Sequence, residues 1–260
     1  MTMANPMLCL FTKTYQEQSF CAGRHFTRLD LTGLSGTNCY CDDEAALEIG
    51  RRLCRFPLAS VHFLDSGNYH YMTDLWLRRV ECPFRLLVFD NHTDMQPPAF
   101  GDILSCGSWL YHTLRNNPCL KEVYLVGPDE ESYAQTDQKL RDKVAFLSRE
   151  RLKVRQEEAQ EWVSGIPADL PLYISIDKDI LCPEEACTGW SQGDMTLDRL
   201  CRLLDRLVES IKRHKGSLLG VDICGEAPID TPDVHGVNDR ANSRLLALFT
   251  PCFQEKENEK

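Results

Sequence analysis

The sequence predicts an α/β fold, a three-layer αβα sandwich with a mostly parallel central sheet. Short apolar runs alternate with amphipathic stretches along most of the 260 residues. These runs are rich in β-branched residues and lack the polar alternation of a strand with one solvated face. This order is typical of a parallel sheet that is covered by helices on both faces. No internal repeat or linker interrupts it, so one domain spanning 1–260 is the simplest interpretation.

The apolar runs and the stretches between them define the expected elements. Strands are expected at Cys9–Phe11, Phe26–Leu31, Ser60–Leu64, Arg85–Phe89, Glu122–Val126, Leu172–Ile176 and Leu218–Ile223. Helices are expected at Asp43–Arg55, Tyr71–Val80, Gly101–Asn116, Ser132–Gln160, Thr196–His214 and Val237–Phe249. Asp43 and Thr196 are candidate N-caps of their helices. The charged segment Ser132–Gln160 is expected to be a mostly solvated helix, and residues 253–260 a disordered tail.

Composition excludes several classes of function. A formal net charge of −10 and a pI near 5.2 argue against nucleic acid or an anionic membrane as the main partner. No stretch approaches the roughly 18 apolar residues that span a bilayer, and residues 1–15 do not resemble a secretory signal. The thirteen cysteines are therefore expected to be reduced thiols of a cytoplasmic protein. Cys39-Tyr-Cys41 lacks a second pair of matching spacing and does not indicate a zinc site.

Two strand ends carry an unusual concentration of ligand-type side chains. Asp90-Asn-His92-Thr-Asp94 directly follows one apolar run, and Asp177-Lys-Asp179 follows another. Alternate side chains of an extended backbone project to one side, and ligands of parallel sheets bind beyond the carboxyl ends of the strands. Four aspartates that met there would repel one another strongly without cations. Oxygen ligands with imidazole and no thiolate suit an ion such as Mn²⁺.

These residues resemble a known family. The motifs Asp90-x-His92-x-Asp94 and Ser175-x-Asp177-x-Asp179 are similar to the two metal signatures of the ureohydrolase superfamily, which contains arginases and agmatinases. The resemblance runs in order from about residue 60 to residue 228. The segments that extend it are Ser66-Gly67-Asn-Tyr-His70, Pro183, Ala186-Cys-Thr188-Gly189, Gly193-Asp-Met-Thr196 and Gly220-Val-Asp222-Ile-Cys-Gly-Glu226-Ala-Pro228.

The resemblance implies an arginase-like fold with two Mn²⁺ ions per chain. One ion would be bound by His70, Asp90, Asp94 and Asp177. The other would be bound by His92, Asp90, Asp177 and Asp179. Two cations about 3.5–4 Å apart can ionise a shared water near neutral pH, so the attacking group would be a bridging hydroxide.

The resemblance also implies roles for residues around the metals. Asp94 would orient the hydroxide and pass its proton to the departing amine. Glu226 would act in catalysis and substrate binding by pairing with a cationic guanidinium. Thr188 and Trp190 are further candidates for substrate binding. The implied reaction is hydrolysis of a C–N bond of a linear amidine, which releases urea from a small, cationic guanidino compound. A homo-oligomer is compatible with this interpretation.

Departures from the family pattern leave alternatives open. The family places a histidine in the loop after the first motif, whereas here the loop 103–109 has none, and His112 falls in a predicted helix. The spacings from Gly67 to His70 and from Asp222 to Glu226 are each one residue longer than in the family. Two alternatives to urea release are therefore left open: the same metal site acting on a formimino compound or an acylated amine, and a non-catalytic, metal-stabilised binding protein.

A phosphotransferase of the haloacid dehalogenase type, with Asp177 as nucleophile and Asp179 as acid, is a further alternative. It leaves Asp90, His92 and Asp94 unexplained.

Overall fold

The computed structural model describes residues 5–227 and 235–253 and contains one eight-stranded sheet in which every pairing is parallel. The strand order is β2-β1-β4-β10-β9-β5-β7-β8. The strands are β1 (Met7–Leu10), β2 (Thr27–Asp30), β4 (Val61–Phe63), β5 (Phe84–Phe89), β7 (Leu120–Val126), β8 (Val144–Leu147), β9 (Leu172–Asp177) and β10 (Leu218–Cys224). A separate antiparallel pair is formed by β3 (Tyr40–Cys41) and β6 (Leu104–Ser105).

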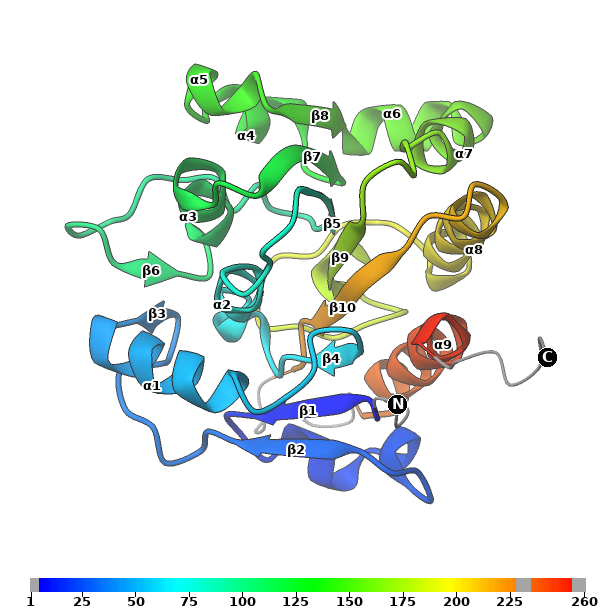
Figure 1. The fold of residues 1–260 in the computed structure, drawn as a ribbon. Coiled ribbons are helices and arrows are strands. Elements are labelled where there is room, and N and C mark those ends of the chain that lie inside the picture. Colours follow the sequence, from blue (N-terminus) through cyan, green and yellow to red (C-terminus); the bar gives the residue numbers. More distant parts are fainter. Residues whose placement is uncertain (1–4, 228–234, 254–260) are drawn as a thin grey trace.

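Helices cover both faces of the sheet, as Figure 1 shows. One layer comprises α1 (Asp43–Leu53), α2 (Met72–Leu77), α3 (Trp109–Asn116), α4 (Glu130–Ala134) and α5 (Gln138–Arg141). The other comprises α6 (Arg149–Val154), α7 (Gln156–Ser164), α8 (Leu197–Arg213) and α9 (His235–Phe253). Along β5, Leu86 and Val88 enter the first core whereas Leu87 and Phe89 enter the second. The predicted three-layer αβα fold is therefore confirmed.

All seven predicted strands are present, but one predicted helix is wrong and another begins later than predicted. The segment Ser132–Gln160 is not one solvated helix, because Val144–Leu147 pairs with β7 and becomes the edge strand β8. In the segment Gly101–Asn116 the helix begins only at Trp109, after the short strand β6.

Of the two predicted N-caps, one is wrong and the other is confirmed. The N-cap of α1 is Asp42, which accepts from the backbone N–H of Ala45 at 2.8 Å, and not Asp43. Thr196 caps α8 as predicted, accepting from the N–H of Arg199. Of the predicted tail, Phe253 ends α9, and residues 254–260 lie outside the described part.

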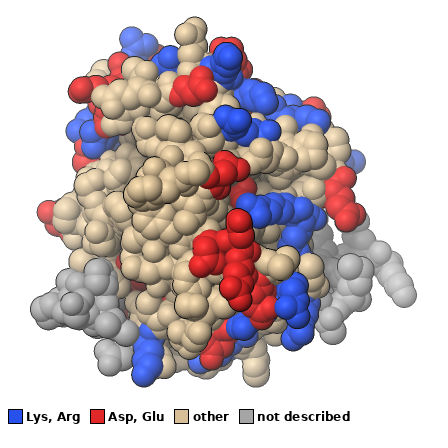
Figure 2. All heavy atoms as spheres, turned by 90° about the vertical axis from the view of Figure 1, so that its left-hand side faces the viewer, with Lys and Arg blue, Asp and Glu red and all other residues tan. Residues whose placement is uncertain are grey.

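The surface shown in Figure 2 carries acidic side chains in a strip beside basic ones, and leaves a broad uncharged area next to them. No continuous basic patch crosses this face, which agrees with the net charge of −10. Within the described ranges, no helix has both the length and the apolar character needed to cross a membrane.

Candidate metal centre

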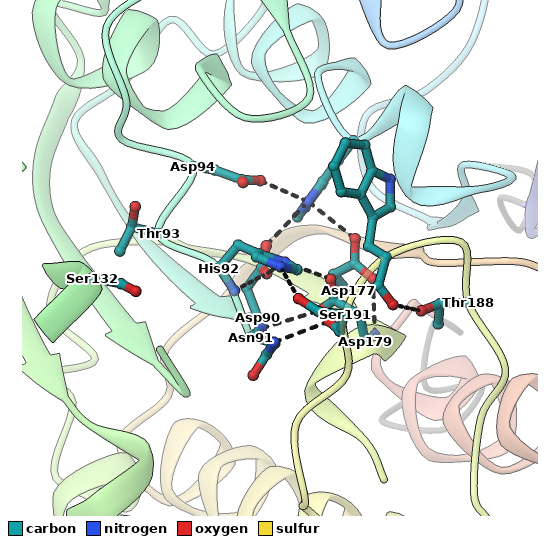
Figure 3. Close-up of polar contacts among 12 residues, drawn as sticks. Asp90, Asn91, His92, Thr93, Asp94, Ser132, Asp177, Asp179, Thr188 and Ser191 are labelled. Atoms are coloured by element: carbon teal, nitrogen blue, oxygen red, sulfur yellow. Dashed lines mark hydrogen bonds and ion pairs between the residues drawn. The ribbon is translucent and has the colours of Figure 1, made fainter. Parts of the chain in front are cut away.

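The two acidic motifs meet because β5 and β9 are neighbouring parallel strands. Phe89 pairs with Ile176 at the last register position, so Asp90 and Asp177 are the next residues on adjacent strands. Asp179 lies in a 3₁₀ turn, Lys178–Ile180, at the end of β9. His70 follows another 3₁₀ turn, Gly67–Tyr69, after β4. Figure 3 shows the aspartates of both motifs pointing toward one centre.

One group of candidate ligands surrounds His70. Its Nδ1 lies 3.2 Å from Asp90 Oδ2, 3.1 Å from Asp94 Oδ2 and 3.4 Å from Asp177 Oδ2. The other ring nitrogen, Nε2, is 2.9 Å from the hydroxyl of Ser175. An imidazole whose far nitrogen is hydrogen-bonded in this way is oriented like a metal ligand. His70 is buried, as are the three carboxylates.

A second group shares Asp90 with the first. His92 Nδ1 lies 2.8 Å from Asp179 Oδ2 and 3.6 Å from Asp90 Oδ1. Its Nε2 is 2.8 Å from the hydroxyl of Ser191. The backbone N–H of Asn91 donates to Asp179 Oδ1 at 3.0 Å, which fixes that carboxylate. Two overlapping sets, His70/Asp90/Asp177 and Asp90/His92/Asp179, are therefore close enough to hold one ion each.

The buried charges fit divalent cations. Asp90 Oδ2 is fully buried, and its contact with His70 Nδ1 at 3.2 Å lacks the geometry of a hydrogen bond, so none of the described residues donates to it. Such a buried oxygen is costly unless a cation is bound. Burial and then the charges of Asp179 and Asp90 raise the pKa of Asp177 to about 8. Burial lowers the pKa of His92, but contacts with Asp179 and Asp90 outweigh this and raise it to about 12. The site thus favours positive charge, and its oxygen and imidazole donors suit Mn²⁺.

Asp94 is held in a strained conformation beside these groups. Its φ of +49° lies in the left-handed region, which non-glycine residues adopt rarely and which is over-represented at functional sites. The indole N–H of Trp109 donates to Asp94 Oδ2 at 2.5 Å. The carbonyl oxygen of Asp94 accepts from the backbone N–H groups of Leu110 and Tyr111, at 3.1 and 3.2 Å. The first residues of α3 therefore fix both the carboxylate and the backbone carbonyl of Asp94.

A cavity of about 400 Å³ opens onto the six candidate ligands. Trp190 forms part of its wall and packs edge-on against His92, and its contact with a substrate stays a prediction. A Cβ atom on Gly67 would lie 2.7 Å from the Trp190 ring, so only glycine fits there. The other residues that line the cavity are Asn91, Thr93, Gln96, Cys106, Gly107, Asp129, Ser132, Arg149, Ser191 and Gln192.

Two predicted substrate residues lie away from this cavity. Glu226 is buried, forms an ion pair with Lys178, and accepts from the side-chain amides of Gln18 and Asn242, each at 2.7 Å. Thr188 donates to the carbonyl of Trp190 at 3.0 Å and so supports the loop that carries that ring. Neither residue belongs to the cavity lining. The side chain of Glu226 points to Lys178 instead. Their predicted roles in substrate binding stay predictions.

The structure also adds residues that sequence reasoning missed. Arg149 lines the cavity, where it donates to Asn91 Oδ1 at 3.2 Å and lies 3.6 Å from Asp129 Oδ2. It begins α6 directly after β8, in the segment that was predicted as one helix, so no sequence signal placed it at a strand end. His112 is buried in α3 with Nε2 3.3 Å from the carbonyl of Ile103, and it does not line the cavity.

Comparison with known proteins identifies the family. A sequence model of the arginase family matches residues 71–241. The chain belongs to the arginase family. An uncharacterised protein of Thermotoga maritima is 33% identical over 173 residues, which cover 64% of this arginase-family chain and 58% of that relative. The aligned part thus spans less than two thirds of the relative.

Solved structures share the arginase-family fold at low sequence identity. Proclavaminate amidino hydrolase from Streptomyces clavuligerus superposes with a TM-score of 0.71 at 12% identity, covering 96% of this chain and 93% of that one. Arginase from Bacillus cereus gives 0.70 at 12% identity, covering 99% and 100%. Formimidoylglutamase from Bacillus subtilis gives 0.67 at 14%, covering 96% and 88%. The chain therefore has an arginase-family hydrolase fold that carries groups of candidate metal ligands.

Proposed function

We propose that this arginase-family chain is a binuclear, manganese-dependent hydrolase of C–N bonds, and that it releases urea from a guanidino compound. The observation that carries the proposal is the pair of ligand groups that share Asp90. Together they place buried negative charge and two imidazoles around Asp90, whose Oδ2 is buried and accepts no well-formed hydrogen bond from the described residues, although His70 Nδ1 lies 3.2 Å away. A buried cluster of this kind is costly as a purely structural feature.

The proposed ligands fall into two sets. His70, Asp90, Asp94 and Asp177 would hold one Mn²⁺, while Asp90, His92, Asp177 and Asp179 would hold the other. When bound, two such cations lower the pKa of a shared water and stabilise negative charge that develops on the attacked group. The hydrogen bonds that join His70 Nε2 to Ser175 and His92 Nε2 to Ser191 orient the two imidazoles for this task.

The protein itself supplies proton transfer and positioning. The carboxylate of Asp94 faces the cavity, and the indole N–H of Trp109 fixes its Oδ2. A carboxylate held in this way can accept a proton from the nucleophile and return it to the leaving nitrogen. Trp190 forms a flat apolar wall on the same side as His92. This wall limits the width of the substrate group that can reach the metals.

Arg149 favours a second candidate substrate that carries an acidic end. The predicted cationic substrate depended on Glu226, which instead pairs with Lys178. Arg149 faces the cavity with 31% of its side chain exposed, and a guanidinium is the natural partner of a carboxylate. A formimino, acylated or guanidino acid, with its C–N bond at the metals and its carboxylate at Arg149, fits this lining. We place the reaction in the cytoplasm.

The test combines metal analysis with turnover. Protein loaded with Mn²⁺ is assayed for urea and ammonia release from guanidino, formimino and acetylated amines, with and without a terminal carboxylate. We expect turnover of at least one class, and a loss of about 100-fold or more in kcat for Asp94→Asn. Asp102→Asn is the matched control, since this carboxylate is 85% exposed and outside the cavity lining. Two bound ions without turnover of any substrate would contradict catalysis.

A further inference from the structure

Cys39 and Cys106 lie opposite each other at the end of the β3–β6 pair. Tyr40 pairs with Ser105 and Cys41 with Leu104, so the next position in this antiparallel register joins Cys39 to Cys106. The N–H of Cys106 donates to the carbonyl of Cys39 at 2.9 Å, and the two thiols lie near enough for each to affect the pKa of the other. Opposed residues of antiparallel strands have Cα atoms about 4.5–5.5 Å apart, within the separation of about 4.4–6.8 Å that a disulfide bridges.

The backbone at Cys39 is strained in a way that the metal site does not explain. Its φ is +62°, and the N–H of Tyr40 donates to the carbonyl of Asn38 at 2.7 Å. This closes a three-residue turn with Cys39 at the apex, a rare and strained geometry for a residue with a side chain. Strain of this kind persists only where the surroundings hold it. Here it keeps Cys39 against Cys106.

Cys106 links this pair to the candidate metal centre. Cys106 and Gly107 both line the cavity. Cys106 belongs to a tight turn in which the N–H of Ser108 donates to the carbonyl of Ser105 at 3.2 Å. Trp109 follows directly, and its indole N–H holds Asp94. A displacement of Cys106 would therefore be passed along three residues to the partner of a candidate metal ligand.

A zinc site is a poorer explanation of the pair. The groups of histidine, cysteine and acidic side chains that approach closely enough to share an ion include only the two sets around Asp90, as far as the described ranges extend. Neither set contains Cys39 or Cys106. Two adjacent thiols without further ligands are suited to a covalent bond with each other.

We propose that Cys39 and Cys106 are a redox-active thiol pair whose disulfide bond reshapes the cavity wall beside the metal centre. The thiolate of one cysteine attacks a low-molecular-weight disulfide and releases one small thiol. The other cysteine then attacks the mixed disulfide and releases the second. The two protein thiols lose two protons and two electrons, which leave with the two small thiols. The sulfur atoms close to about 2.05 Å, which draws the Ser105–Ser108 turn toward Cys39.

The test maps the bond and then measures its effect on metal binding. Full-length protein is treated with oxidised glutathione at a pH of about 9, because burial raises the pKa of both thiols and only thiolates react. After alkylation and digestion, mass spectrometry should find a Cys39–Cys106 peptide that dithiothreitol removes. The exposed Cys54 and Cys82 should carry glutathione at most. Oxidation should weaken Mn²⁺ binding by about tenfold.

Two double variants provide the controls. C39S/C106S should keep its Mn²⁺ affinity through the same treatment, whereas C54S/C82S should lose affinity as the wild type does. Finding Cys39 and Cys106 unlinked while Cys54 and Cys82 are modified would overturn the proposal. A complete bond with unchanged Mn²⁺ affinity would also overturn it. The effect on the metals rests on the proposed metal centre, but neither readout needs turnover, so a protein without hydrolase activity would still give a clear answer.

Discussion

At the scale of single residues, the candidate ligands depend on neighbours that hold them in place. Ser175, Ser191 and Trp109 each hydrogen-bond a candidate ligand from outside the cluster. Ser175 belongs to the second motif, but Trp109 and Ser191 carry no spacing signal that would connect them to the metals. The sequence could therefore predict the ligands, whose types and alternation are distinctive, but only one of the three residues that orient them.

Trp109→Phe tests this support directly. The substitution keeps an aromatic side chain in the core but removes the N–H that donates to Asp94 at 2.5 Å. We expect activity to fall by about 10–100-fold, because groups that orient metal ligands contribute this much. Trp162→Phe is the control, since Trp162 packs on Tyr124 outside the cavity lining. Equal activities of the two variants would show that Asp94 does not need its indole partner.

Gly67→Ala probes the close packing beneath Trp190. The added methyl group would lie 2.7 Å from the Trp190 ring, closer than van der Waals contact allows, and at a tight 3.3 Å from Asp177 Oδ2. We expect weaker Mn²⁺ binding and lower activity, measured by titration and by steady-state kinetics. Gly107→Ala is a matched control from the same cavity, because its Cβ would meet nothing within 4 Å. A harmless Gly67→Ala would mean that the Trp190 loop can move aside freely.

The buried pair Lys178 and Glu226 should matter for stability. Both side chains are almost inaccessible, and removing one partner of a buried ion pair costs about 3–5 kcal/mol. Lys178→Met is therefore expected to lower the free energy of unfolding by that amount in a denaturant titration. The double variant Lys178→Met/Glu226→Gln should recover a large part of the loss. A double variant as unstable as the single one would show that the charge pairing is not the cause.

At the scale of elements, the strands were predictable but the segment after β7 was not. All seven predicted strands overlap observed strands, because each is an apolar run of strand length. β8 is only partly buried at the sheet edge, so its apolar signal is weak within a charged stretch. Because β8 was not predicted, the position of Arg149 was not predicted either. Arg149 lies at the start of α6, just beyond the end of that strand.

The cap of α6 offers a test at this scale. Ser148 is buried, and its hydroxyl accepts from the N–H of Arg151 at 3.2 Å. Ser148→Ala should lower the free energy of unfolding by about 1 kcal/mol, the typical contribution of an N-cap. It should also loosen Arg149 and raise KM for acidic substrates. Ser164→Ala, at a half-buried position in the last turn of α7 where the hydroxyl donates only within its own helix, to the carbonyl of Glu161, should change neither quantity.

At the scale of the whole molecule, metal binding should be coupled to pH and to stability. The pKa of Asp177 in the folded chain is raised from 3.8 to about 8 by burial first and then by its acidic neighbours. The folded protein therefore holds a proton that the unfolded chain has already released over this range. Stability without metal should fall as the pH rises from 3.8 to about 8. The raised pKa of His92 acts in the same direction up to about 12.

Divalent cations should reverse this trend, because they replace the protons. Mn²⁺ affinity should increase as the pH rises toward 8, since the carboxylates must be deprotonated to bind. Thermal unfolding with and without Mn²⁺ at several pH values would measure both effects. The stabilisation by Mn²⁺ should be largest at the alkaline end, and a stabilisation independent of pH would argue against binding at Asp177.

In the proposed metal centre, six side chains from three segments hold two divalent cations that share Asp90 and Asp177. Equilibrium dialysis against Mn²⁺ at a pH of about 8, followed by metal analysis, tests it most directly. We predict two ions per chain for the wild type and loss of both in Asp90→Ala. One ion or none in the wild type, or two ions that remain in Asp90→Ala, would contradict the account.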